Sequence, residues 1–278
     1  GAAMLSPAAF PEVLHMLLAS YAATGFAVAG IHALLLRRDP RNAFHRRALT
    51  IALIVGVPAA ILQPVSGDIS GRYVARWQPP KLAAMEGQFR TQAGAPLRLG
   101  GVPDVSAQRT RWAIDIPYGL SLMAFHDPHA VVRGLEAFPR DEWPPVPIVH
   151  IAFQVMVGLG TLLALVALWV AVSAWRRRDI ATDRRLLAAI AAAAPIGFIC
   201  IEAGWVVTEV GRQPWVIYGV MRTAKAVTPM PGLIVPFLVI SALYCFLGVI
   251  VVWLLYDLVM RSPRAGGLHA AAAAPVDA

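Results

Sequence analysis

The sequence predicts an all-α membrane protein, a bundle of about five transmembrane helices with one long extracytoplasmic loop. Three observations lead to this class. Hydrophobic residues make up 58% of the 278-residue chain and charged residues only 14%. Several apolar stretches reach the roughly 20 residues that a helix needs to cross a bilayer. The alternating apolar and polar pattern typical of an outer-membrane barrel does not occur in the sequence.

The first two spans are expected at about residues 11–36 and 48–65. The first begins near Pro11, because proline is favoured in the first turn of a helix, and it ends before Pro40. The second contains Pro58 and Pro64, which predict a kinked or early-ending helix. These two helices make up segment 1–65.

Residues 66–147 form the only sizeable hydrophilic stretch, and a loop of this length is usually functional or mobile. The pattern of Lys81–Phe89 within it predicts a short amphipathic helix. The prolines of Trp143–Pro147 predict an extended chain that leads into the next span. The three remaining spans are expected at about 148–175, 186–208 and 232–260, within segment 148–261. Residues 262–278 are expected to be a disordered cytoplasmic tail.

The net charge of +8 comes from arginines gathered in short loops and not from a nucleic-acid-binding surface. Short basic loops favour the cytoplasmic side. This rule places the N-terminus outside, the C-terminus in the cytoplasm and the long loop outside, and we expect no nucleic acid as a partner. The basic residues between or after the spans are Arg37, Arg38, Arg41, Arg46, Arg47, Arg176, Arg177, Arg178, Arg184, Arg185, Arg261 and Arg264.

Cysteines and most histidines carry no site in this interpretation. Cys200 and Cys245 lie within spans and are expected to be packing residues, not a disulfide or metal pair. Five histidines are expected at surface or interfacial positions. They are His32, His45, His126, His129 and His150.

Glu202 is the most informative residue, because it lies in the apolar run Pro195–Val207. A carboxylate within a bilayer costs about 3 kcal/mol on insertion scales, so it is usually paired, protonated, metal-bound or exposed to a water-filled path. A structural ion pair and a chemical role both remain open for it.

His15, Met156 and Glu202 lie at similar depths on three different spans. At about 1.5 Å per residue, all three fall in the outer half of the membrane, within about 10 Å of one plane. An imidazole and a thioether on opposite helices suit a six-coordinate haem, whereas a single carboxylate leaves the iron open. We expect the three side chains to converge. The alternatives are an interfacial histidine, a core methionine and a structural carboxylate.

Gly211–Trp215, with the sequence Gly-Arg-Gln-Pro-Trp, follows the fourth span. The Arg212 guanidinium could bind a propionate or phosphate in a bidentate manner. An ordinary interfacial turn is the alternative.

Taken together, these motifs resemble subunit I of cytochrome bd quinol oxidase, in its C-terminal part. The resemblance keeps the same order over nearly the whole chain, and Gly-Arg-Gln-Pro-Trp after a Glu-Ala-Gly-Trp span is its most specific feature. The matching segments are Gly67–Gly71, Lys81–Glu86, Glu202–Trp205, Gly211–Trp215 and the flanks of His15 and Met156.

The resemblance implies the chemistry. His15 and Met156 match the axial ligands of a low-spin haem b, and Glu202 matches the ligand of a high-spin haem b beside haem d or a further haem b. Segment 66–147 matches the quinol-binding loop, with Lys81 and Glu86 at the quinol. Arg212 is the expected haem-propionate ligand. The implied enzyme oxidises ubiquinol or menaquinol at the outer face of the bacterial inner membrane and reduces oxygen to water, which builds a proton gradient.

The implied partners are subunit II, a small third subunit and membrane lipid. Lys81 and Glu86 are five residues apart, roughly 140° around a helix, so both contact one quinol only if the helix bends or ends between them.

Two departures from the family pattern stand out. Family members carry about four more helices before the position of His15, so we expect a fragment, a split subunit or a truncated sequence that lacks part of the oxygen site. Gln154 stands where many members have arginine, which removes a positive charge near the low-spin haem. The short loop resembles the short-loop, cyanide-insensitive branch.

Two other functions remain open at this stage. One is a small transporter or channel that uses Glu202 as a proton or cation site. The other is a non-catalytic, haem-binding fragment.

Overall fold

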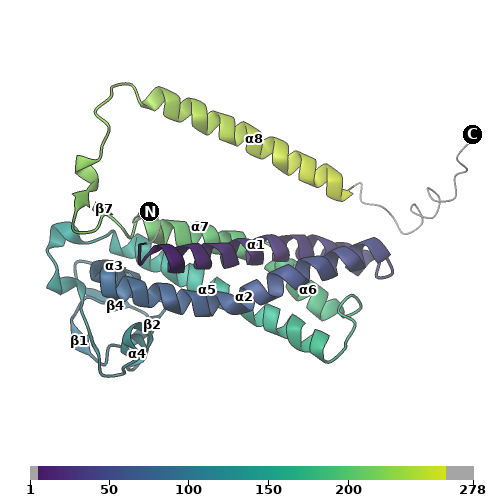
Figure 1. Ribbon diagram of the computed structural model, residues 1–278, viewed down its shortest axis with the longest axis horizontal. Helices are drawn as coiled ribbons and strands as arrows, with labels where there is room; N and C mark the ends of the chain where they lie inside the picture. Colours follow the sequence, from purple (N-terminus) through teal and green to yellow (C-terminus); the bar gives the residue numbers. More distant parts are fainter. Residues whose placement is uncertain (1–5, 261–278) are drawn as a thin grey trace, which may run out of the picture.

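The computed structural model describes residues 6–260, so the expected tail at 262–278 lies outside the described residues. It contains five helical spans long and apolar enough to cross a membrane, which confirms the predicted fold class. One of these spans consists of two helices, α6 and α7. Helix α8 lies apart from the other long helices (Figure 1). The long helices are α1 (Ala9–Arg38), α2 (Ala43–Trp77), α5 (Val146–Trp175), α6 (Arg184–Ala193), α7 (Ile196–Glu209) and α8 (Ile234–Met260).

Helix α2 is longer than the sequence predicts. Its N-cap is Asn42, whose side chain accepts a hydrogen bond from the backbone N–H of His45 at 3.2 Å. The helix continues through Pro58 and Pro64 to Trp77, so an early end is the wrong prediction. In an apolar environment, leaving the helix would expose more backbone groups than the two prolines remove, and this favours its continuation.

Backbones approach closely where α1 crosses α2. A Cβ atom on Gly25 would lie 2.5 Å from the Cα atom of Gly56, a distance that real Cβ atoms do not reach. Fully buried apolar side chains, including Phe26, Leu36 and Ile190, fill the core beside this crossing. Small residues therefore fix how near these helices stand, as in many membrane bundles.

The fourth span is broken between α6 and α7, at Ala194 and Pro195. Proline has no backbone N–H, and the carbonyl of Ala191 instead accepts from the N–H of Ala194 at 3.3 Å. The two halves pack on different neighbours: α6 lies mainly on α1, whereas α7 lies mainly on α5.

The segment between α2 and α5 is folded, and most of its first helix is buried. Helix α3 (Pro79–Met85) is followed by short strands and by α4 (Gly119–Phe125). The predicted helix over Lys81–Phe89 is thus confirmed at its start but ends at Met85, and residues 82–89 are all buried, which does not fit an amphipathic helix. The strands pair antiparallel: β1 (Gln92–Ala93) with β6 (Val131–Val132), β2 (Leu97–Leu99) with β5 (Ile114–Ile116), and β3 (Val102–Asp104) with β4 (Arg109–Arg111).

After α7 the chain forms the hairpin β7 (Trp215–Ile217) and β8 (Met221–Arg222), and then reaches α8. No side chain between Ile234 and Leu258 of α8 is buried. Figure 1 shows the gap between α8 and the bundle.

Candidate functional site

Glu86 is the most unusual side chain of the loop. It caps the C-terminus of α3, is only 4% exposed, and its Oε2 atom is buried with no hydrogen-bond partner among the described residues. Burial raises the pKa of Glu86 to about 8, and the positive charge of Arg98 partly opposes this rise. A carboxyl group with such a pKa can hold a proton near neutral pH and release it at slightly higher pH.

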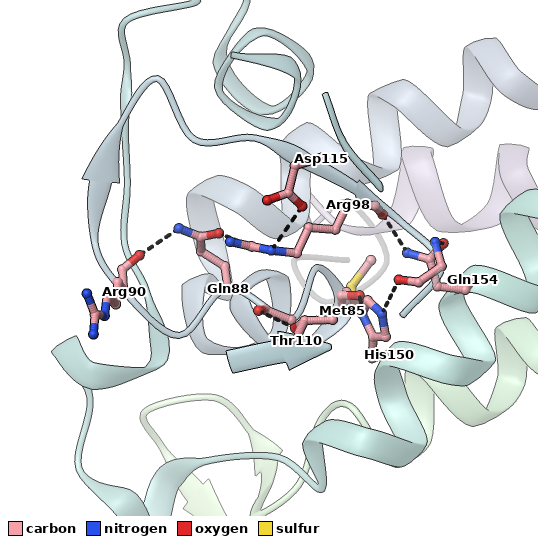
Figure 2. Close-up of polar contacts among 10 residues, drawn as sticks. Met85, Gln88, Arg90, Arg98, Thr110, Asp115, His150 and Gln154 are labelled. Carbon is pink, nitrogen blue, oxygen red and sulfur yellow. Dashed lines mark hydrogen bonds and ion pairs between the residues drawn. The ribbon is translucent and has the colours of Figure 1, made fainter. Parts of the chain in front are cut away.

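Arg98 connects this buried region to the surface. Its guanidinium donates to Oε1 of Gln88, and its Nε atom lies 3.7 Å from Oδ1 of Asp115. The amide of Gln88 in turn donates to the backbone carbonyl of Arg90 at 2.6 Å. Figure 2 shows Arg98 lying between Gln88 and Asp115. A fixed positive charge therefore stands between the buried Glu86 and the half-exposed Asp115.

His150 corrects a prediction, because it is fully buried and not at the surface. Its Nδ1 atom lies 2.8 Å from the carbonyl oxygen of Met85, and its Nε2 atom lies 3.1 Å from the carbonyl oxygen of Gly100. The ring thereby links the first turns of α5 to the end of α3 and to the turn after β2 (Figure 2).

His45 is the second corrected histidine. It is 3% exposed, and its Nδ1 atom lies 3.1 Å from Nδ1 of His32, near the end of α1 opposite the loop. The prediction of a surface position was wrong because the His45 ring packs against the rings of His32 and Phe44, with centroid distances of 5.2 Å and 5.4 Å.

Gln154 lies one helical turn after His150 on the same side of α5. Its amide nitrogen donates to the carbonyl of Arg98 at 3.0 Å, and its Oε1 atom accepts from the N–H of Gly100 at 2.9 Å. We call His150 and Gln154 together the α5 anchor, because both side chains hold the backbone of the loop segment 98–100 to this helix (Figure 2).

Lys81 lies on the other side of α3. Its ε-carbon is 3.3 Å from the point where a Cβ on Gly211 would stand, so Gly211 leaves room for the lysine. Burial lowers the pKa of Lys81 to about 8, and the charge of Arg212 adds to this effect. A small cavity beside it is lined by Lys81, Arg212 and Trp215, among others, and Glu86 is not part of its lining.

The structure therefore places Lys81 and Glu86 in different surroundings. Helix α3 ends between them, which is the condition that the spacing requires for both to contact one quinol. Arg212, the third charged residue of this region, is half-buried and donates to Glu209 at 3.2 Å.

His15 is half-buried between α1 and α2. Its Nδ1 atom lies 2.9 Å from Oγ of Ser66, and that hydroxyl donates its hydrogen to the carbonyl of Gln63 at 2.9 Å. Ser66 must then accept from His15, so the proton is on Nδ1, and Nε2 is the unprotonated nitrogen, which faces the amide of Gln63. The amide nitrogen of Gln63 lies 3.2 Å from this Nε2.

Met156 is half-buried on α5, and its sulfur lies 3.0 Å from the point where a Cβ on Gly204 of α7 would stand. Glu202 is exposed, and it has no hydrogen bond or ion pair within residues 6–260. Two residues correspond to about 200° on a helix, so Glu202 points away from the side of α7 that meets Met156. The carboxylate and the thioether thus lie on two different sides of α7, and the prediction that His15, Met156 and Glu202 converge is wrong for Glu202.

Sequence reasoning missed four contributors to the site, namely Gln88, Arg98, Ser66 and Gln63, and misplaced His150. A polar residue at the start of an apolar span is a signal that was present for His150. Gln88 and Arg98 gave none, because their roles depend on how the loop folds back. In the part of the chain that the structure describes, no three His, Cys, Asp or Glu side chains cluster as metal ligands.

Known proteins resemble this chain over most of its length. The family model for cytochrome bd terminal oxidase subunit I matches residues 1–263. A Bacillus subtilis protein provisionally named cytochrome bd menaquinol oxidase subunit I is 38% identical over 94% of this chain and 60% of its own length. Cytochrome bd ubiquinol oxidase subunit 1 of the same organism is 28% identical over 97% of this chain and 59% of its own length.

The solved structure of the bd oxidase from Geobacillus thermodenitrificans has the same fold. It aligns with a TM-score of 0.83 and 35% identity, over 94% of this chain and 60% of that chain. The chain thus spans about three fifths of the length of these relatives. A multi-pass membrane protein with these helices fits the resemblance stated from the motifs, and the comparisons do not favour a transporter or channel. The family model matches nearly the whole chain, and this protein therefore belongs to the cytochrome bd terminal oxidase subunit I family.

Proposed function

We propose that this chain forms the quinol-oxidising, haem-holding part of a bd-type terminal oxidase, which passes electrons from quinol to oxygen. The observation that carries the proposal is Glu86, a buried carboxyl group with an unpartnered oxygen atom in the loop that follows α2. Burying such a group without a partner is costly, so a ligand that hydrogen-bonds to it explains its presence.

Quinol oxidation requires groups that hold the quinol hydroxyls and accept their protons. Glu86 accepts a proton when it is ionised, and its raised pKa keeps that proton exchangeable near neutral pH. Lys81 donates a hydrogen bond to a quinone oxygen as a compact charge. Arg98 keeps the ionised form of Glu86 accessible, and Asp115 provides an exposed acceptor beyond it. The quinone is ubiquinone or menaquinone.

The residues present fit haem at two separate places. His15 offers an unprotonated Nε2, oriented by Ser66, and Met156 offers a thioether on α5; we assign these two to a low-spin haem b. Glu202 offers an exposed carboxylate on the opposite side of α7, and we assign it to a high-spin haem b beside haem d or another haem b. Arg212 is assigned to a haem propionate. When bound, the haems supply one-electron transfer and the reduction of oxygen to water.

The arginine pattern supports an N-terminus outside and a C-terminus in the cytoplasm of a bacterial inner membrane. In this orientation the loop, Glu86 and Lys81 face the outside, so quinol protons are released there and contribute to a proton gradient. The proposed partners are a subunit II, a small third subunit and membrane lipid.

Haem assignment is tested by reduced-minus-oxidised spectra of purified membranes that contain the full protein. His15→Ala and Met156→Leu are each expected to lose the low-spin b-type absorption bands while the protein still inserts. His129→Ala and Met123→Leu, two exposed positions of the loop, serve as matched controls. Unchanged bands in both His15 and Met156 variants would contradict the assignment.

Quinol oxidation is tested by Glu86→Gln, which keeps the size of the side chain. The rate is expected to fall about a hundredfold, the usual scale for a lost proton acceptor, with all haem bands retained. The control is Glu136→Gln on the loop surface, whose carboxylate accepts only from the backbone of Thr91. A normal rate in the Glu86 variant would refute its role.

A further inference from the structure

A basic groove lies at the surface beside α3, and neither Glu86 nor Lys81 is among its lining residues. It has a volume of about 870 Å³ and lies between the start of α1, the end of α2 and the α4–β6 part of the loop. Its charged lining consists of Arg72, Arg76, Arg133 and His126. None of the residues proposed for haem or quinol lines it.

Depth is the first argument. Residues 48–67 of α2 carry no charged side chain, and 20 helical residues span roughly 30 Å, the thickness of the hydrocarbon core. Asp68 is the first charged residue after this run, and Arg72 and Arg76 follow at about 6 Å and 12 Å further along the axis. These guanidinium groups therefore stand at the level of lipid headgroups.

Charge is the second argument. Arg72 pairs with Asp68 at 2.8 Å, but its Nε atom is buried and has no partner. Arg76 is exposed and forms no hydrogen bond or ion pair within residues 6–260, and Arg133 contacts only the ring of Phe138, at 4.4 Å. Asp68 also lies 3.8 Å from His126 and is the one acidic group paired with the lining cations in the described chain. The three guanidinium groups thus have one ion-pair partner between them among the described residues, Asp68, and the carboxylate of Glu12 lies near Tyr73 of the same lining.

The remaining lining is apolar and aromatic, and part of it is exposed. Phe10 is 68% exposed, Trp77 52% and Val131 58%, and the ring of Tyr73 lies 6.5 Å from that of Trp77. Aromatic rings are enriched at the membrane–water interface, where one part of a lipid is apolar and the other polar. The groove therefore combines cations for a phosphate with aromatic surface for the interfacial part of a lipid.

We propose that the groove binds one anionic glycerophospholipid, in the leaflet that meets the C-terminal end of α2. Its phosphate lies between Arg72 and Arg76 and accepts hydrogen bonds from their terminal guanidinium nitrogens. Its acyl chains leave the groove past Ile69, toward the hydrocarbon core, and its glycerol region lies beside Phe10. Guanidinium groups hold phosphate oxygens in a bidentate manner. A headgroup with a net negative charge also neutralises these cations, whereas a zwitterionic headgroup does not.

The test uses the full protein, purified with its partner subunits and placed in phosphatidylcholine nanodiscs with increasing phosphatidylglycerol. Native mass spectrometry counts the phosphatidylglycerol that stays bound. Arg72→Gln/Arg76→Gln is expected to weaken its binding about thirtyfold, from two lost cation contacts. The matched control is Arg90→Gln/Arg109→Gln, which removes the same charge from exposed positions outside the groove.

A second measurement guards against misfolding of the double variant. Arg76→Gln alone breaks no contact of the described chain, and it is expected to reduce quenching of Trp77 by phosphatidylglycerol that carries a spin label on its headgroup. Trp77→Phe identifies the contribution of Trp77 to the fluorescence.

Three results would overturn the proposal. The first is equal retention of phosphatidylglycerol in the wild type and the groove variants. The second is an equal loss in the control variant, which would indicate surface charge alone. The third is unchanged lipid binding with a raised KM for quinol in the groove variants, which would make the groove a quinol site.

Discussion

Two regions of the helix bundle are built on different principles. In the middle of the bundle, the backbones of α1 and α2 almost touch at Gly25 and Gly56, and buried apolar side chains surround this crossing. Toward the loop, His15 and Gln63 are half-buried and Ser66 is buried, and their hydrogen bonds leave Oε1 of Gln63 without a partner in the described chain. The first region fixes the positions of the helices, whereas the second leaves polar groups ready for a ligand.

The largest effect on stability should come from adding a side chain at the crossing of Gly25 and Gly56. Gly25→Ala puts a methyl group 2.5 Å from the Cα of Gly56, so the helices must separate. We expect a loss of roughly 3 kcal/mol in stability, seen as a lower unfolding midpoint in detergent. Gly158→Ala on α5, which has no atom within 4 Å of the added group, is the control and should be neutral or slightly stabilising. Equal midpoints for both variants would show that the crossing is not tight.

The next effect should come from the α5 anchor. A neutral imidazole carries one N–H, so His150→Phe removes one donated hydrogen bond, to the carbonyl of Met85 or of Gly100, and the ring nitrogen beside the other carbonyl. We expect faster hydrogen exchange at Gln88 and Leu99, equivalent to about 2 kcal/mol in local stability, with the spans unchanged. His129→Phe, in the exposed part of the loop, should leave these rates as they are. Unaltered hydrogen exchange in the His150 variant would argue against the α5 anchor.

A pH effect should follow from Arg98. In the folded protein the pKa of Glu86 is about 8, so its carboxylate forms as the pH rises through that value, and quinol oxidation should rise with it. Because folding raises the pKa of Glu86 from 4.5 to about 8, its protonation stabilises the folded loop fully below about pH 4.5, and this stabilisation is lost as the pH rises from there to about 8. Arg98→Met removes the charge that opposes the shift, so the rate profile should move to higher pH.

Rates measured from pH 6 to 10 test this, with Arg90→Met as the control for the loss of one loop arginine. A profile that stays in place, or moves to lower pH, would refute the role of Arg98.

The smallest effect should come from Asp115, which is 53% exposed and 3.7 Å from Arg98. Asp115→Asn frees Arg98 slightly to face Glu86, so the profile should move to lower pH by less than the Arg98 variant moves it upward. Rates should change less than about twofold at pH 7. A larger change would mean that Asp115 is a required proton acceptor.

The sequence allowed the fold class and four of the five span boundaries to be predicted within a few residues, because apolar length is a local property. It did not predict that α2 continues through Pro58 and Pro64, since the cost of leaving a helix depends on the surrounding medium. The residues of the expected site were found by resemblance, whereas the network of Gln88, Arg98 and His150 depends on the loop folding back onto α5. Contacts between segments 50 residues apart leave no local pattern.

Helix α5 carries His150, Gln154 and Met156 within its first three turns. The backbone of the loop at 98–100 is thus hydrogen-bonded to the same helix that carries the Met156 thioether. A substrate that displaces this loop would also shift α5, so binding in the loop can move the thioether before any charge is transferred.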